Sequence, residues 1–172
     1  MVSNKKRLYI ALYPSGVVNN EERRYHWGFL VGPKDEKSEE VPGARYHVRN
    51  MPVRGWIYEE RQLDNVRGTA SLLTRIVIAK ITDEQRLVEI LRNNPVVQHD
   101  PNWRCRTWVA QALRAIEQDG KCVGSAVLDW ETIEATAREY TATKAGEGRF
   151  DTGDMLMPKP TWDMLENREV VP

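Results

Sequence analysis

The residue types that support nucleophilic catalysis are few in this chain, so their positions are informative. There are two cysteines, Cys105 and Cys122, and three histidines, His26, His47 and His99. A cysteine thiol becomes a strong nucleophile when an imidazole accepts its proton, and a further polar group usually orients that imidazole. Such a pair attacks an acyl carbonyl carbon and forms a thioester. The question is which histidine the fold can bring to which cysteine.

Cys105 lies near the start of a helix that the hydrophobic periodicity predicts over residues 102–118. If Asn102 caps this helix, Cys105 is its third residue; if Asp100 caps it, with Pro101 in the first position, Cys105 is the fifth. Unpaired N–H groups at a helix N-terminus lower a thiol pKa and can stabilise an oxyanion. Cys105 also begins the apolar stripe of the helix, so an unreactive buried cysteine is the alternative interpretation.

His26 opens a predicted strand over residues 25–33. Because side chains alternate along a strand, His26 and Gly28 share one face and Trp27 packs on the other. The glycine leaves room for another element to approach the imidazole, and we expect the helix start that carries Cys105 to be that element. The alternative is a structural histidine whose ring nitrogens bind backbone groups.

The chemistry-bearing residues sit on elements whose order favours an α+β fold. Strands are expected over residues 7–13, 25–33, 44–50, 55–63 and 74–81. Helices are expected from a cap at Thr82 or Asp83 to residue 93, then over 102–118 and 129–141. Strands first and helices after predict an antiparallel sheet of about five strands packed by helices. Residues 144–172, which contain Gly, Pro and Met, are expected to form a tail that packs on the domain or is partly mobile.

Composition argues against several classes of partner and ligand. Lys plus Arg and Asp plus Glu number 25 each, so no overall positive field favours nucleic acid. No apolar run approaches the roughly 20 residues of a membrane span, and no signal peptide is predicted. The histidines and cysteines lack the spacing of metal ligands, and no motif indicates a cofactor. We expect a cytoplasmic protein with reduced cysteines, no metal, no cofactor and no integral membrane association.

Two stretches, "RYHWGFLVG…GARYHV" and "NWRCRTWVAQAL", resemble the circularly permuted papain-like proteins of the NlpC-type superfamily, and most closely the lecithin–retinol acyltransferase-like group. In that group a strand begins His-Trp, a second His lies on the next strand, and the nucleophilic Cys opens a later helix. The family's Asn-Cys-Glu-His run is replaced here by Arg104-Cys105-Arg106-Thr107. The chain is also similar to uncharacterised small fungal proteins with a His-Trp strand and a Cys-x-x-Trp-Val helix.

The resemblance implies a permuted papain-like catalytic domain over residues 1–143 in which Cys105 is the nucleophile, His26 the base and His47 the third member. It implies a thiol hydrolase or acyltransferase that acts through a thioester on an amide or ester, either a small molecule or a peptide. We expect a thiolate–imidazolium pair, with the Cys105 sulfur within about 4 Å of a His26 nitrogen. The thiol pKa should then fall well below its usual ~8.5.

Other interpretations are open at this point. An isopeptidase or peptidase of the same permuted type, or a non-catalytic protein that binds a ligand in the same cleft, would share the pattern. His47 shares a strand face with Arg45 and Arg49, as on a solvated sheet edge, and His99 is interpreted as a loop residue. Several arginines could meet at the site and bind a carboxylate or phosphate, although ordinary surface charge is the favoured explanation: Arg23, Arg24, Arg45, Arg49, Arg104 and Arg106.

Overall fold

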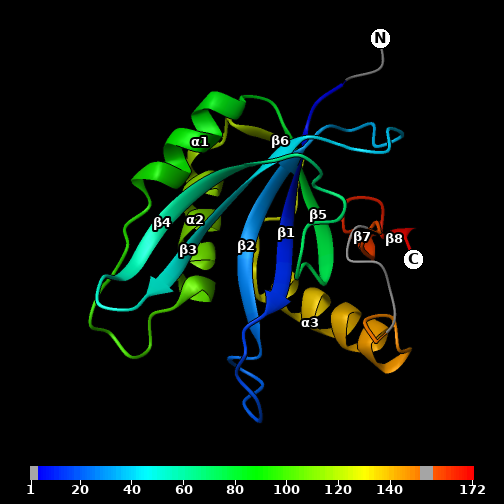
Figure 1. Cartoon of the computed structure of the whole chain (residues 1–172). Helices are drawn as coiled ribbons and strands as arrows, with labels where there is room; N and C mark the ends of the chain where they lie inside the picture. Colours follow the sequence, from blue (N-terminus) through cyan, green and yellow to red (C-terminus); the bar gives the residue numbers. More distant parts are fainter. Residues whose placement is uncertain (1–3, 152–156) are drawn as a thin grey trace.

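Eight β-strands and three α-helices form the described part of the chain, residues 4–151 and 157–172 of a computed structural model (Figure 1). The strands are β1 (Arg7–Pro14), β2 (Tyr25–Gly32), β3 (Gly43–Met51), β4 (Gly55–Leu63), β5 (Thr74–Ile81), β6 (Val123–Ala126), β7 (Thr161–Asp163) and β8 (Arg168–Val171). The helices are α1 (Glu84–Asn93), α2 (Cys105–Asp119) and α3 (Trp130–Gly146).

All eight strands belong to one sheet in the order β4-β3-β2-β1-β5-β7-β8, with β6 paired to β5 off this path. The α+β class and the five predicted strands are confirmed. The sheet is nevertheless larger than the expected five strands, and it is mixed, because β5 and β7 run parallel. The three additional strands have only three or four residues, which is too short for alternation to reveal them.

The segment expected as a tail, residues 144–172, is partly integrated into the sheet. Helix α3 continues to Gly146 instead of ending near residue 141. Strand β7 pairs with β5, and β8 pairs with β7, so the last residues extend the sheet on the side away from β4. Residues 152–156 of this segment lie outside the described residues.

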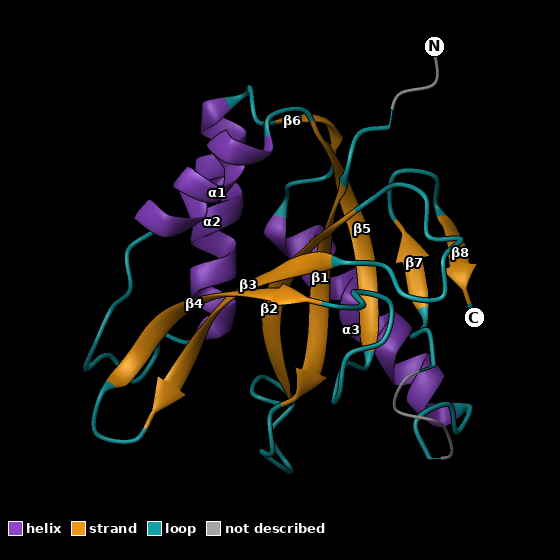
Figure 2. Ribbon diagram, turned by 45° about the horizontal axis from the view of Figure 1, so that its top comes forward, coloured by secondary structure: helices purple, strands orange, loops and turns teal. Residues whose placement is uncertain are grey.

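The helices lie against the sheet (Figure 2). Their apolar faces are buried with it in one cluster. Since side chains alternate along a strand, every second residue of β1 faces this cluster. Its fully buried members include Leu8, Ile10 and Leu12 of β1, Leu87 of α1, Trp108 and Leu113 of α2, and Ile133 of α3. A smaller cluster that includes Tyr9, Ala11 and Leu30 lies on the other face of the strands. No helix in the described ranges is long and apolar enough to cross a membrane.

The helix boundaries explain where Cys105 lies. Asp83 caps α1 as predicted, because its carboxylate accepts a hydrogen bond from the Arg86 N–H at 3.0 Å. Helix α2, however, begins at Cys105 itself, with Arg104 as N-cap, so both predicted starts are wrong. The preceding residues form a separate turn closed on Asp100, whose carboxylate accepts from the Asn102 N–H at 2.9 Å. Cys105 is thus the first residue of the helix.

Strands β2 and β3 pair over only part of their length. Their ladder comprises Phe29–Tyr46, Leu30–Arg45 and Val31–Ala44, and the β3–β4 hairpin then diverges from β2 (Figure 1). A Cβ atom at Gly28 would lie 3.0 Å from the Cβ of His47 and 3.4 Å from the carbonyl oxygen of Tyr46. The glycine therefore admits His47 of the neighbouring strand. The expectation that it admits the α2 N-terminus is wrong.

We predict that Gly28→Ala lowers the free energy of unfolding by roughly 1–3 kcal/mol, because the added methyl group overpacks the contact with His47. Urea unfolding followed by circular dichroism measures this change. Gly146→Ala is the matched control: no atom lies within 4 Å of a Cβ at this exposed helical position. It should be neutral or stabilise the protein by up to about 1 kcal/mol. Equal stabilities of Gly28→Ala and the wild type would contradict the proposed role of Gly28.

Candidate active site

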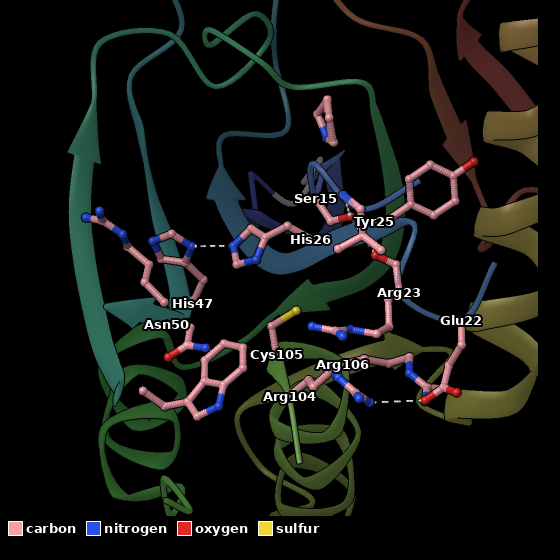
Figure 3. Close-up of a pocket in the computed structure, with 14 residues that line it drawn as sticks. Ser15, Glu22, Arg23, Tyr25, His26, His47, Asn50, Arg104, Cys105 and Arg106 are labelled. Atoms are coloured by element: carbon pink, nitrogen blue, oxygen red, sulfur yellow. Dashed lines mark hydrogen bonds and ion pairs between the residues drawn. The ribbon is translucent and has the colours of Figure 1, made fainter. Parts of the chain in front are cut away.

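The divergence of β2 and β3 opens a pocket of about 450 Å³ (Figure 3). It brings together residues from the strand ends, from the β1–β2 loop and from the start of α2. His26, His47 and Cys105 all line it, so the three residues singled out from the sequence meet in one place. The pocket is also lined by Pro14, Ser15, Val17, Glu22, Arg23, Tyr25, Arg49, Asn50, Trp56, Arg104 and Arg106.

A chain of hydrogen bonds runs through the two histidines and ends on a carboxylate. His26 Nε2 lies 2.8 Å from His47 Nδ1, and His47 Nε2 lies 2.9 Å from Glu59 Oε1. The other carboxylate oxygen of Glu59 accepts from Arg49 at 2.8 Å. His47 is buried, with only 5% of its surface exposed, so it is not a residue of a solvated sheet edge.

The donor-to-acceptor direction of this series of hydrogen bonds is determined by the carboxylate at its end. An ionised Glu59 only accepts hydrogen bonds, so His47 must carry its proton on Nε2. The lone pair on His47 Nδ1 then accepts from His26, which places the His26 proton on Nε2. The network consequently assigns a free lone pair to His26 Nδ1. A base needs this lone pair to accept a proton.

Burial and the charges around these hydrogen-bonded residues favour neutral imidazoles beside an ionised carboxylate. Burial raises the pKa of Glu59, but the hydrogen bonds from His47 and Arg49 outweigh it and bring the pKa to about 2. Burial and the nearby charges of His47, Arg45 and Arg49 lower the pKa of His26 to about 4. Burial also lowers the pKa of His47, and the hydrogen bond to Glu59 opposes this only in part. His26 is therefore an uncharged proton acceptor at neutral pH.

Cys105 is buried at the helix start with its side chain directed into the pocket (Figure 3). Burial raises the pKa of the thiol, although backbone N–H groups of Trp27 and Arg106 hydrogen-bond to the sulfur and oppose the rise. The expected lowering of the Cys105 pKa is therefore wrong, because desolvation outweighs the helix N-terminus. No hydrogen bond joins the sulfur to His26 among the described residues. The resting site holds a thiol and a neutral imidazole instead of an ion pair.

The remaining cysteine and histidine lie outside this pocket. Cys122 is fully buried, and burial followed by the charge of Asp119 raises the pKa of its thiol to about 11. His99 is exposed in the loop before α2, where it lines a different cavity with Gln98 and Pro101. The interpretation of His99 as a loop residue is confirmed.

Glu59 is a site residue that was not identified from the sequence, although a signal was available. The hairpin of β3 and β4 closes between Met51 and Gly55, and the same register pairs His47 with Glu59 directly across the two strands. Counting outward from the turn at residues 52–54 would have found this pair.

Four of the six arginines considered from the sequence line the pocket, namely Arg23, Arg49, Arg104 and Arg106. Ordinary surface charge is therefore an incomplete explanation for this group. The other two lie elsewhere: Arg24 pairs with Glu21 at 3.3 Å, and Arg45 lies behind the histidines, 3.7 Å from Glu59.

Comparison with protein families places the chain in one whose activity has not been established. A model of the family of unknown function DUF6914 matches residues 5–171, so the chain belongs to this family. Comparison with curated proteins found no match, and comparison with solved structures found none. Arguments about activity therefore depend on the site itself.

We predict that the free energy of unfolding falls as the pH is lowered from about 6.5 towards 4. Over this range His26 binds a proton in the unfolded chain but not in the folded one. One such group contributes a slope of at most about 1.4 kcal/mol per pH unit. His26→Gln removes this group and should reduce the pH dependence of the free energy of unfolding, measured by urea unfolding between these pH values. His99→Gln, the exposed control, should keep the wild-type slope. Parallel slopes for His26→Gln and the wild type would show that His26 titrates normally.

Proposed function

We propose that this member of the DUF6914 family is a cysteine-nucleophile hydrolase or acyltransferase that forms a thioester on Cys105. The observation that carries the proposal is the hydrogen-bond chain from Glu59 through His47 to His26, which ends beside the pocket that also holds Cys105. A carboxylate-anchored imidazole facing a thiol at a helix start suits acyl transfer.

The proposed reaction begins with proton transfer. His26 Nδ1 accepts the Cys105 proton as the sulfur attacks the acyl carbonyl carbon, giving a tetrahedral oxyanion and an imidazolium. The imidazolium then gives its proton to the leaving amine or alcohol, and the carbon–heteroatom bond breaks to leave a thioester. In the second half, water or another acceptor attacks the thioester while His26 takes the acceptor's proton. The carbon–sulfur bond then breaks to release the acyl group on its new acceptor, and His26 returns the proton to the departing sulfur, which regenerates the thiol.

Two groups at the pocket can stabilise the oxyanion. The backbone N–H of Cys105 lies at the first position of α2, where N–H groups have no intrahelical acceptor. Asn50 lines the same pocket, and its side-chain amide makes no hydrogen bond within the described ranges. An amide in this position can donate to an oxyanion without first breaking another bond.

In the proposed reaction, the neutral resting state requires general-base catalysis instead of a preformed ion pair. His26 has a pKa of about 4 and Cys105 a raised pKa, so the proton remains on sulfur until attack. Glu59 stabilises the positive charge that then develops on the two imidazoles, since its carboxylate lies 2.9 Å from His47. The carboxylate in serine hydrolases stabilises the imidazolium in a comparable way.

The order of the elements also supports the proposal. His26 on β2, His47 on β3 and Cys105 at the start of α2 follow the order expected for the permuted papain-like proteins of the NlpC-type superfamily. We infer that the domain is a permuted papain-like one, in which the strands that carry the histidines precede the helix that carries the nucleophile.

A non-catalytic binding protein is the second candidate. Two observations favour it: burial raises the pKa of Cys105, and no hydrogen bond joins Cys105 to His26 in the described part of the chain. A binding protein would keep the pocket but would not form a covalent intermediate. The two candidates therefore differ in whether Cys105 becomes acylated.

We predict that p-nitrophenyl acetate acetylates Cys105 and that the acyl-enzyme is detected by mass spectrometry of the intact protein and its peptides. His26→Ala should lower the acetylation rate by roughly 10²–10⁴-fold, because the base is lost. Cys105→Ser should not accumulate the intermediate, and His99→Gln should behave as the wild type. Acetylation of Cys105 at equal rates in the wild type and His26→Ala would exclude His26 as the base. Absence of acetylation on Cys105 would favour the binding protein.

We predict that His47→Gln reduces the same rate less than His26→Ala does, by roughly 10–100-fold, because His47 positions the base and does not touch the acyl group. Glutamine can still accept from His26 but cannot share the developing charge. Heteronuclear NMR of the imidazole nitrogens gives an independent readout. The Nε2–H tautomer of His26 should dominate in the wild type and lose its dominance in His47→Ala. An unchanged tautomer would contradict the positioning role.

A further inference from the structure

The pocket that holds Cys105 carries an excess of positive charge. Four arginines line it, whereas Glu22 is the one carboxylate among its described lining residues. Glu22 is half exposed and pairs with Arg104 at 3.2 Å and with Arg106 at 2.9 Å. Arg49 is paired with Glu59 behind His47. Arg106 also pairs with Glu134 at 3.1 Å. Three of the four arginines thus have a carboxylate partner, and one does not.

Arg23 is the lining arginine without a carboxylate partner among the described residues. Its guanidinium makes no hydrogen bond or ion pair with any residue in the described ranges, and it extends into the pocket toward Cys105 (Figure 3). An unpaired guanidinium has five N–H donors in a planar fork that matches a carboxylate or a phosphate. In the free protein these donors can only be satisfied by solvent or by a ligand.

The position of Arg23 is maintained by its loop. Ser15 Oγ donates to the carbonyl oxygens of Arg23 and Arg24, at 2.5 and 2.9 Å. From α3, Arg138 donates to the carbonyl oxygens of Glu21 and Glu22 at 2.7 and 3.1 Å. The backbone on both sides of Arg23 is therefore held by other elements, and the side chain needs no partner of its own to stay at the pocket.

We propose that Arg23 binds an anionic group of the substrate, a carboxylate or a phosphate, that lies close to the carbonyl carbon attacked by Cys105. This inference rests on the proposed function and specifies its substrate class. The proximity follows from the direction of the Arg23 side chain toward Cys105 within one pocket of about 450 Å³. The neighbouring Arg104 and Arg106 strengthen the local positive potential, and Glu22 moderates it.

The test compares alkylation of Cys105 by iodoacetate, which is anionic, and by iodoacetamide, which is neutral and nearly the same size. The rate with iodoacetate is divided by the rate with iodoacetamide. This ratio is then divided by the same ratio measured for the free thiol 2-mercaptoethanol under the same conditions. We expect a normalised ratio above one in the wild type. Arg23→Gln should lower it by roughly fivefold, as expected for loss of one nearby charge, and Arg23→Lys should largely retain it.

Two matched variants control for general charge effects. Arg24→Gln removes a charge from the adjacent position, which does not line the pocket, and should leave the ratio unchanged. Glu22→Gln removes the lining carboxylate and should raise the ratio. A ratio that is the same in Arg23→Gln and the wild type overturns the assignment of Arg23. If neither reagent alkylates Cys105 faster than Cys122, the proposed function fails and this inference fails with it.

A second measurement distinguishes the two anions. Acetate and inorganic phosphate are tested, at an ionic strength matched with chloride, for protection of Cys105 against iodoacetamide. Protection by acetate alone identifies a carboxylate as the substrate group, and protection by phosphate alone identifies a phosphate. The protection should be lost in Arg23→Gln and kept in Arg24→Gln. Absence of protection by both anions contradicts an anion site at Arg23.

Discussion

The hydrogen bond between Glu59 and His47 is the constraint on which the candidate site depends. An ionised carboxylate can only accept, so this contact determines which nitrogen of His47 carries the proton, and the next contact determines the same for His26. The hydrogen bonds from His47 and from Arg49, which donates to the second oxygen, keep Glu59 ionised. The free lone pair of His26 thus results from the charge of Glu59, which acts on His26 through His47.

The contact between His26 and His47 depends in turn on the path of β2 and β3. Gly28 faces His47 just past the end of the paired segment, where an added Cβ would lie 3.0 Å from the His47 Cβ, and beyond this point the strands separate. The approach brings the two imidazoles within hydrogen-bond distance, and the separation leaves space for the N-terminus of α2. A fully paired β2–β3 ladder would fill that space with backbone hydrogen bonds and would exclude Cys105 from the histidines.

Burial has opposite effects on the two proposed partners, and together these effects define the resting state. It lowers the pKa of His26 and raises that of Cys105, so both groups are uncharged near neutral pH. A buried ion pair would need compensation for the desolvation of two charges. The neutral arrangement avoids this cost, and charge separation is needed only when an acyl group is attacked. The arginine-lined pocket, with Arg23 unpaired among the described residues, is suited to the negative charge that a substrate would bring.

Much of the fold and part of the site could be predicted from the sequence. The five long strands and the cap at Asp83 follow from local patterns, because alternation and side-chain capping are properties of neighbouring residues. The same patterns placed His26 at a strand start and Cys105 near a helix start. Strands of three or four residues carry no such pattern, so the contribution of the last residues to the sheet was not predicted.

Only the tertiary structure decided what these residues face. Glu59 becomes part of the site through the register of the β3–β4 hairpin. Gly28 of β2 leaves room for His47 of the neighbouring strand β3. The direction of the shift in the Cys105 pKa was predicted wrongly. It depends on the balance between the helix N-terminus and desolvation by residues distant in sequence. The sequence by itself determined which groups are available and on which elements they lie. Their protonation and mutual orientation depend on burial and on long-range contacts, which exist only in the folded chain.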